Sequence, residues 1–117
     1  EPNPELLERA GARVTPHRQP ALAVDGVDLV TTDVFASMGQ EAEQQLRLEK
    51  FNGFQVDHTL MSHAANNALF MHCLPAHRGE EVSAELLEDS QISVVWDEAE
   101  NRLHAQKALM LLLLNKA

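Results

Sequence analysis

Three short apolar segments, separated by stretches of helical composition, constrain the fold of this chain more than any other feature. They cover residues 27–32, 68–74 and 92–96, and each is apolar enough for a strand that is covered on both faces. Alternating strands and helices are typical of βαβ units, whose strands lie parallel. The helices are expected at residues 5–10, 21–24, 37–48, 56–63, 83–87 and 100–115.

The sequence therefore predicts an α/β fold, a Rossmann-like three-layer domain with a mostly parallel sheet. A further short strand is expected at residues 13–15, where Arg-Val-Thr follows the glycine that ends the first helix. The chain has 117 residues, which is enough for one domain with a sizeable core. It shows neither an internal repeat nor a linker.

Polar segments follow all three predicted strands. Residues 33–39 follow the first strand, residues 72–79 close and follow the second, and residues 97–102 follow the third. In parallel sheets, binding sites usually lie beyond the carboxyl ends of the strands. We therefore expect these segments to meet at one functional edge.

The composition excludes several classes of protein. There are 9 basic and 18 acidic residues, a net charge of −9, so a nucleic-acid-binding surface is not expected. The longest apolar run, residues 108–114, is shorter than the roughly 20 residues that a membrane span needs. A single cysteine excludes an internal disulfide and fits a reducing compartment. We expect a cytoplasmic protein without nucleic-acid or membrane partners.

Three motifs carry a family resemblance. Residues 71–79, Met-His-Cys-Leu-Pro-Ala-His-Arg-Gly, resemble the His-Cys-Leu-Pro loop of the ornithine carbamoyltransferases. Residues 33–41 resemble the Ser-Met-Gly loop of that family, and residues 97–102 resemble the stretch that opens its C-terminal helix. Three matches in the family's order are more specific than any one of them. The resemblance implies an enzyme that transfers a carbamoyl group from carbamoyl phosphate to L-ornithine, giving L-citrulline and phosphate.

The same resemblance implies the residues of the site. Those implied to bind ornithine are Asp33, Ser37 and Met38. Those implied to bind carbamoyl phosphate are Cys73, Leu74 (through its main-chain carbonyl) and Arg102. Asp33, Cys73 and Arg102 would take part in the chemistry, Arg102 by stabilising the oxyanion that develops on the carbamoyl group. Neither a cofactor nor a metal is implied.

Each residue also has an ordinary structural explanation. A strand-end aspartate such as Asp33 suits a turn, and Ser37 suits a helix cap. A lone cysteine such as Cys73 is commonly a buried structural thiol. Arg102 could pair with the acidic residues at positions 97, 98 and 100.

The resemblance covers only part of such an enzyme. The family's phosphate-binding Ser-Thr-Arg-Thr-Arg segment is not found in the sequence, nor is the strand with an Asn-containing turn that opens its ornithine domain. Residues 1–117 are therefore expected to be a partial ornithine-binding domain, incomplete at its N-terminal edge. The resemblance implies that residues 100–117 are the C-terminal helix, which packs on an N-terminal carbamoyl phosphate domain. Residues 109–114 are apolar on all sides, which requires that they be buried. The resemblance also implies a homotrimer when the enzyme is complete.

Other functions remain open at this level. The chain could be a non-catalytic amino-acid-binding module, or part of a carbamoyltransferase for putrescine or a modified ornithine. A metal site on His72, Cys73 and His77 is disfavoured, because adjacent residues on a strand point to opposite sides.

Overall fold

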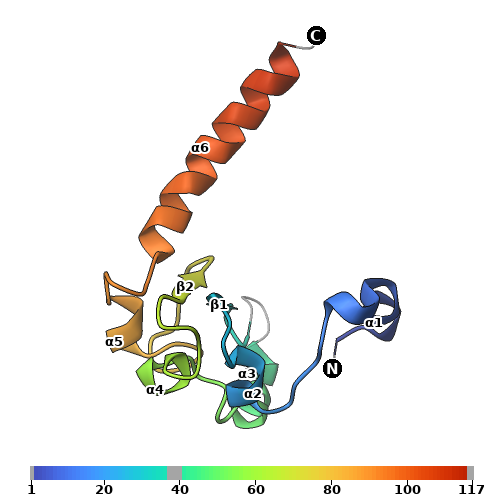
Figure 1. The fold of residues 1–117 in the computed structure, drawn as a ribbon, viewed down its shortest axis with the longest axis vertical. Coiled ribbons are helices and arrows are strands. Elements are labelled where there is room, and N and C mark those ends of the chain that lie inside the picture. Colours follow the sequence, from blue (N-terminus) through green and yellow to red (C-terminus); the bar gives the residue numbers. More distant parts are fainter. Residues whose placement is uncertain (1, 37–40, 116–117) are drawn as a thin grey trace.

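The computed structural model describes residues 2–36 and 41–115. Its elements are α1 (Pro4–Ala10), the 3₁₀ helix η1 (Gly11–Arg13), α2 (Pro20–Val24), β1 (Leu29–Thr32), α3 (Glu41–Lys50), α4 (His58–Met61), β2 (Leu69–His72), α5 (Ala84–Leu87) and α6 (Val95–Leu114). Figure 1 shows β1 and β2 among the short helices, with α6 extending away from them and α1 lying apart on the other side.

The two strands form a parallel sheet, which confirms the predicted α/β class. Leu29 pairs with Leu69 and the register continues to Thr32 opposite His72. The chain crosses from β1 to β2 by way of α3 and α4 (Figure 1). Such a crossover is what brings two consecutive strands into parallel pairing.

The third predicted strand, at residues 92–96, is wrong. The Phe70 N–H donates to the Ile92 carbonyl and the Val94 N–H donates to the Phe70 carbonyl, at 2.9 and 3.0 Å. This is a single parallel bridge, because α6 already begins at Val95. Two acidic residues in the first turn of α6 favour this early start, since negative charge stabilises a helix N-terminus. The last helix therefore begins before its predicted start at Glu100.

The strand predicted at residues 13–15 is also wrong. Gly11 caps α1 with a φ of 56°, and η1 carries the chain through Arg13. Val14 has an extended backbone but pairs with no strand in the described part of the chain.

The helix predicted at residues 56–63 is shorter than expected. Val56 makes a parallel bridge with Val82 instead, and α4 starts only after Asp57. The Asp57 side chain caps α4 by accepting the Leu60 N–H at 2.7 Å. An aspartate at this position ends the extended segment and begins the helix.

The core surrounds β2. Phe70 is wholly buried at its centre, and Val82, α5 and the start of α6 pack around it. The wholly buried apolar side chains, each at most 1% exposed, are Phe70, Val82, Leu86, Leu87 and Val95. This packing fixes the end of β2 and the loop that follows it.

Two polar side chains, His72 and Glu81, are wholly buried beside this core. The Leu74 N–H donates to His72 Nδ1 at 2.9 Å, so the ring proton lies on Nε2, which donates to Glu81 Oε1 at 3.1 Å. The His77 N–H donates to the same Glu81 oxygen at 2.6 Å. Glu81 therefore holds the loop after β2 at two points.

Most of α6 packs against none of the other described residues. Beyond Val95 it is exposed along nearly its whole length, and the side chains of residues 109–114 are between 54% and 69% exposed. The expected all-apolar surface is therefore uncovered here. Within the described residues, no helix has the combination of length and hydrophobicity needed to cross a bilayer.

The buried hydrogen bonds of Glu81 give the first prediction. Glu81→Ala should destabilise the protein by at least about 2 kcal/mol, because two buried N–H donors lose their acceptor. The free energy of unfolding from urea titration would measure the change. Glu85→Ala removes an exposed glutamate of α5 and serves as the control. Equal stability of the two variants would contradict the assigned network.

Candidate active site

The register of the sheet brings Asp33 and Cys73 together. Thr32 of β1 lies opposite His72 of β2 as the last pair, so the next residue of each strand emerges at the same edge. The Cys73 thiol donates a hydrogen bond to the Asp33 carboxylate. The expectation that residues 33–39 and 72–79 follow neighbouring strand ends is confirmed for their described residues.

Asp33 is held as an ionised carboxylate. The Val34 N–H donates to Asp33 Oδ1 at 2.7 Å and is the largest cause that lowers the pKa of Asp33 below its usual value. The hydrogen bond from Cys73 lowers this pKa further. A carboxylate with such a pKa keeps its charge at neutral pH and suits pairing with an ammonium group.

The Cys73 thiol is affected in the opposite direction. Partial desolvation raises its pKa most, followed by the hydrogen bond to Asp33 and the negative charges of Asp33 and Glu98. The side chain is nevertheless exposed, so its interpretation as a buried structural thiol is wrong. A thiol that keeps its proton at neutral pH suits a hydrogen-bond donor better than a nucleophile.

An open cavity of about 520 Å³ lies beside the thiol. It is bounded on one side by the loop after β2, with Cys73 and Leu74, and on the other by α6, with Trp96 and Arg102. Leu74 has a φ of 53°, and the Leu74–Pro75 peptide is cis. The structure therefore brings Cys73, Leu74 and Arg102 to one cavity.

Arg102 reaches this cavity from a helix. The segment 97–102 lies inside α6 and does not follow a strand, which corrects the predicted placement. In the part of the chain that the structure describes, no ion pair joins Arg102 to the acidic residues at 97, 98 and 100, and Glu100 pairs instead with His104 at 3.2 Å. Arg102 therefore lines the cavity without an ion pair to these three acids among the described residues.

Ser37 and Met38 lie outside the described residues. The segment just before them is anchored, because Ala36 is buried and the Phe35 ring stacks on Phe51 with centroids 4.7 Å apart. Phe51 immediately follows α3, so the stack joins the chain before residues 37–40 to the end of the next helix.

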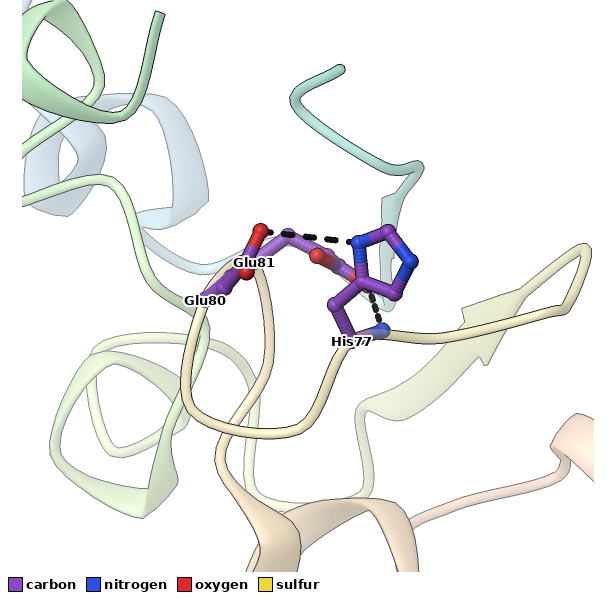
Figure 2. A group of neighbouring side chains, drawn as sticks. All are labelled: His77, Glu80 and Glu81. Atoms are coloured by element: carbon purple, nitrogen blue, oxygen red, sulfur yellow. Dashed lines mark hydrogen bonds and ion pairs between the residues drawn. The ribbon is translucent and has the colours of Figure 1, made fainter. Parts of the chain in front are cut away.

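A second group of side chains could hold a cation. Figure 2 shows His77, Glu80 and Glu81 turned toward one another, and one ligand atom from each lies within 4.8 Å of the others. The set differs from the disfavoured combination of His72, Cys73 and His77, in which both ring nitrogens of His72 are occupied by Leu74 and Glu81.

Sequence reasoning missed two features of these sites. Trp96 lines the cavity but was expected in a buried strand. Glu80 and Glu81 are not singled out by the sequence motifs, because a pair of glutamates gives no sign of burial. The spacing His-x-x-Glu-Glu was the available signal.

Comparison with known proteins agrees with these motifs. The family model "Aspartate/ornithine carbamoyltransferase, Asp/Orn binding domain" matches residues 2–113. The ornithine carbamoyltransferase of Methylococcus capsulatus is 63% identical over 114 residues, which cover 97% of this chain and 38% of that protein. The enzyme of Hydrogenovibrio crunogenus is 57% identical over 117 residues, covering 100% of this chain and 38% of that protein.

Solved structures show the same relationship. The ornithine carbamoyltransferase of Thermus thermophilus superposes with a TM-score of 0.81 at 40% identity, over 97% of this chain and 36% of that one. The enzyme of Pyrococcus furiosus gives a TM-score of 0.71 at 55% identity, over 79% and 29%.

The chain thus spans less than two fifths of the length of these relatives, 38% for the two curated ones. The family model nevertheless matches nearly all of it, and the solved neighbours share its α/β fold. This chain belongs to the aspartate/ornithine carbamoyltransferase family, in the region of its Asp/Orn binding domain.

Proposed function

We propose that the protein containing this chain transfers the carbamoyl group of carbamoyl phosphate to L-ornithine, giving L-citrulline and phosphate. The observation that supports this most is the contact between the Asp33 carboxylate and the Cys73 thiol, at the edge of the cavity that Leu74 and Arg102 share. Through Cys73, a charged anchor for an amine thus adjoins a cavity that holds a cation for a developing oxyanion.

At the ornithine end, Asp33 is the charge partner. Its lowered pKa keeps it anionic, so it binds an ammonium and is a weak base toward it. Ser37 and Met38 are proposed to bind the amino-acid end of ornithine. Cys73 retains its proton and is a polarisable neighbour of the amine. Its hydrogen bond to Asp33 holds that carboxylate in position to orient the amine.

At the carbamoyl end, Arg102 stabilises the transition state. The attacking nitrogen forms a bond to the carbamoyl carbon while the bond from that carbon to the phosphate oxygen breaks. Negative charge gathers on the carbamoyl oxygen in between, and a guanidinium stabilises it without changing protonation. The Leu74 carbonyl is proposed to accept from the carbamoyl amide. The protons that the amine loses leave with phosphate and solvent.

The remainder of the enzyme is proposed to complete the site. The uncovered residues 109–114 of α6 suit packing against a carbamoyl phosphate domain, since exposed apolar patches commonly mark such contacts. That domain would bind the phosphate. We further propose that residues 1–117 are part of the ornithine-binding domain of a cytoplasmic homotrimer.

The charge of Asp33 gives a test of substrate binding. Asp33→Asn in the complete enzyme should weaken ornithine binding by about tenfold or more and leave carbamoyl phosphate binding unchanged, because an ammonium loses its charged acceptor. Calorimetric titration of each ligand measures both constants. Asp28→Asn, an exposed aspartate just before β1, is the control. Equal weakening of both ligands would assign Asp33 a structural role instead.

The same variant has a consequence for pH dependence. The charge of Asp33 raises the pKa of the Cys73 thiol, so Asp33→Asn should lower that pKa. Iodoacetamide alkylation of Cys73 should then reach its half-maximal rate at a lower pH than in the unmodified enzyme. An unchanged pH profile would contradict the contact between these two side chains.

Arg102→Ala should lower turnover more than it weakens ornithine binding. Loss of one oxyanion donor typically costs about 2.7–4 kcal/mol of activation free energy, equivalent to about 10²–10³ in kcat. Steady-state kinetics with both substrates measures the change. Lys107→Ala removes a cation from the same helix outside the cavity and should have little effect. An unchanged kcat in Arg102→Ala would remove this residue from the mechanism.

The isolated chain of 117 residues should form no citrulline and should self-associate through residues 109–114. Sedimentation velocity and a citrulline assay test both statements, and adding the carbamoyl phosphate domain should restore solubility and some transfer. Citrulline production by the chain alone would refute the proposed division of the site between the two domains.

A substrate panel of ornithine, putrescine and modified ornithines with the complete enzyme tests specificity.

A further inference from the structure

The buried carboxyl group of Glu81 is the feature of the structure that the proposed function leaves unexplained. Its side chain is wholly buried; Oε1 accepts from His72 Nε2 and the His77 N–H, whereas Oε2 has no hydrogen-bond partner. The Leu74 N–H occupies His72 Nδ1, so His72 is the neutral tautomer and supplies no positive charge. A buried carboxylate is costly without a compensating charge.

A second such oxygen belongs to the same group. Glu80 Oε2 is also buried and without a hydrogen bond, and His77 Nδ1 lies 3.5 Å from it. Figure 2 shows the Glu81 side chain directed toward the His77 ring with Glu80 beside it. Two neighbouring carboxylates, each with one oxygen that lacks a donor, repel each other unless a positive charge lies between them.

We propose that His77, Glu80 and Glu81 bind one divalent transition-metal ion. One imidazole nitrogen and two carboxylate oxygens form a ligand set that Zn²⁺ accepts, whereas Mg²⁺ and Ca²⁺ prefer oxygen alone. Ligands of a tetrahedral zinc lie about 3.4 Å apart, given bond lengths of about 2.0–2.2 Å. His77 Nδ1 and Glu80 Oε2 already match this spacing at 3.5 Å.

The remaining adjustment is small. All three ligand atoms lie within 4.8 Å of one another, so the metal needs a contraction of at most about 1.4 Å. The three residues share one turn, in which the Glu80 N–H donates to the His77 carbonyl at 3.0 Å. Rotation of the half-exposed His77 ring and of Glu80 can supply the contraction while Glu81 stays in place.

The ion has a structural role distinct from the transfer reaction. It offsets the charge of Glu81, which in turn holds His72 and the loop that contains Leu74. None of the three ligands lines the cavity that contains Cys73 and Arg102. The proposal therefore stands independently of the proposed carbamoyl transfer.

Zinc titration of the complete, chelator-treated protein tests the site. The background is Cys73→Ser, since an exposed thiol is a competing zinc ligand. Calorimetry should show one ion per chain, and zinc should raise the unfolding temperature. Glu80→Gln and His77→Ala should each weaken this binding on the order of tenfold or more and abolish the stabilisation.

Matched controls separate the site from general surface binding. Glu85→Gln and His63→Ala change an exposed glutamate and an exposed histidine outside the group and should leave zinc affinity unaltered. The proposal is overturned if zinc does not bind, or if it binds equally to Glu80→Gln and His77→Ala. Stabilisation by acidification without any zinc binding would also overturn it, because a shared proton would then balance the two carboxylates.

Discussion

The parallel pairing of β1 with β2 is the constraint on which the rest of the structure depends. It places Phe70 at the centre of the core and ends both strands at the same edge. Asp33 and Cys73 meet only because Thr32 lies opposite His72; a shift of one residue would turn the following side chains to opposite faces. The backbone register therefore determines which two side chains meet at this edge.

The contact at this edge gives its two members different properties. Backbone and thiol hydrogen bonds lower the pKa of Asp33, while partial desolvation and the neighbouring charge raise the pKa of Cys73. One member therefore keeps a negative charge and the other keeps a proton across the same pH range. This division of charge is what the proposed transfer to an amine would require.

Periodicity and motifs predicted the α/β class, both paired strands and the strand-end position of Asp33 and Cys73. They failed at residues 92–96, where only a single bridge forms and α6 begins at Val95, because acidic residues in its first turn stabilise that start. They also failed for Glu81, since burial of an acid depends on donors contributed by His72 and His77, which only the folded chain brings together. Local sequence predicts whether a segment forms a helix or a strand. Tertiary contacts determine where that element ends and which acidic side chains are buried.

The exposure of α6 has a consequence for the helix itself. Beyond Val95, this 20-residue helix receives almost no support from the rest of the described chain, so its order depends on a helix–coil equilibrium. In proteins, most of the stability of a helix comes from tertiary packing and not from its intrinsic propensity. The amide groups of residues 109–114 should therefore gain protection from hydrogen exchange only when another surface covers them, which makes this helix an internal reporter of assembly.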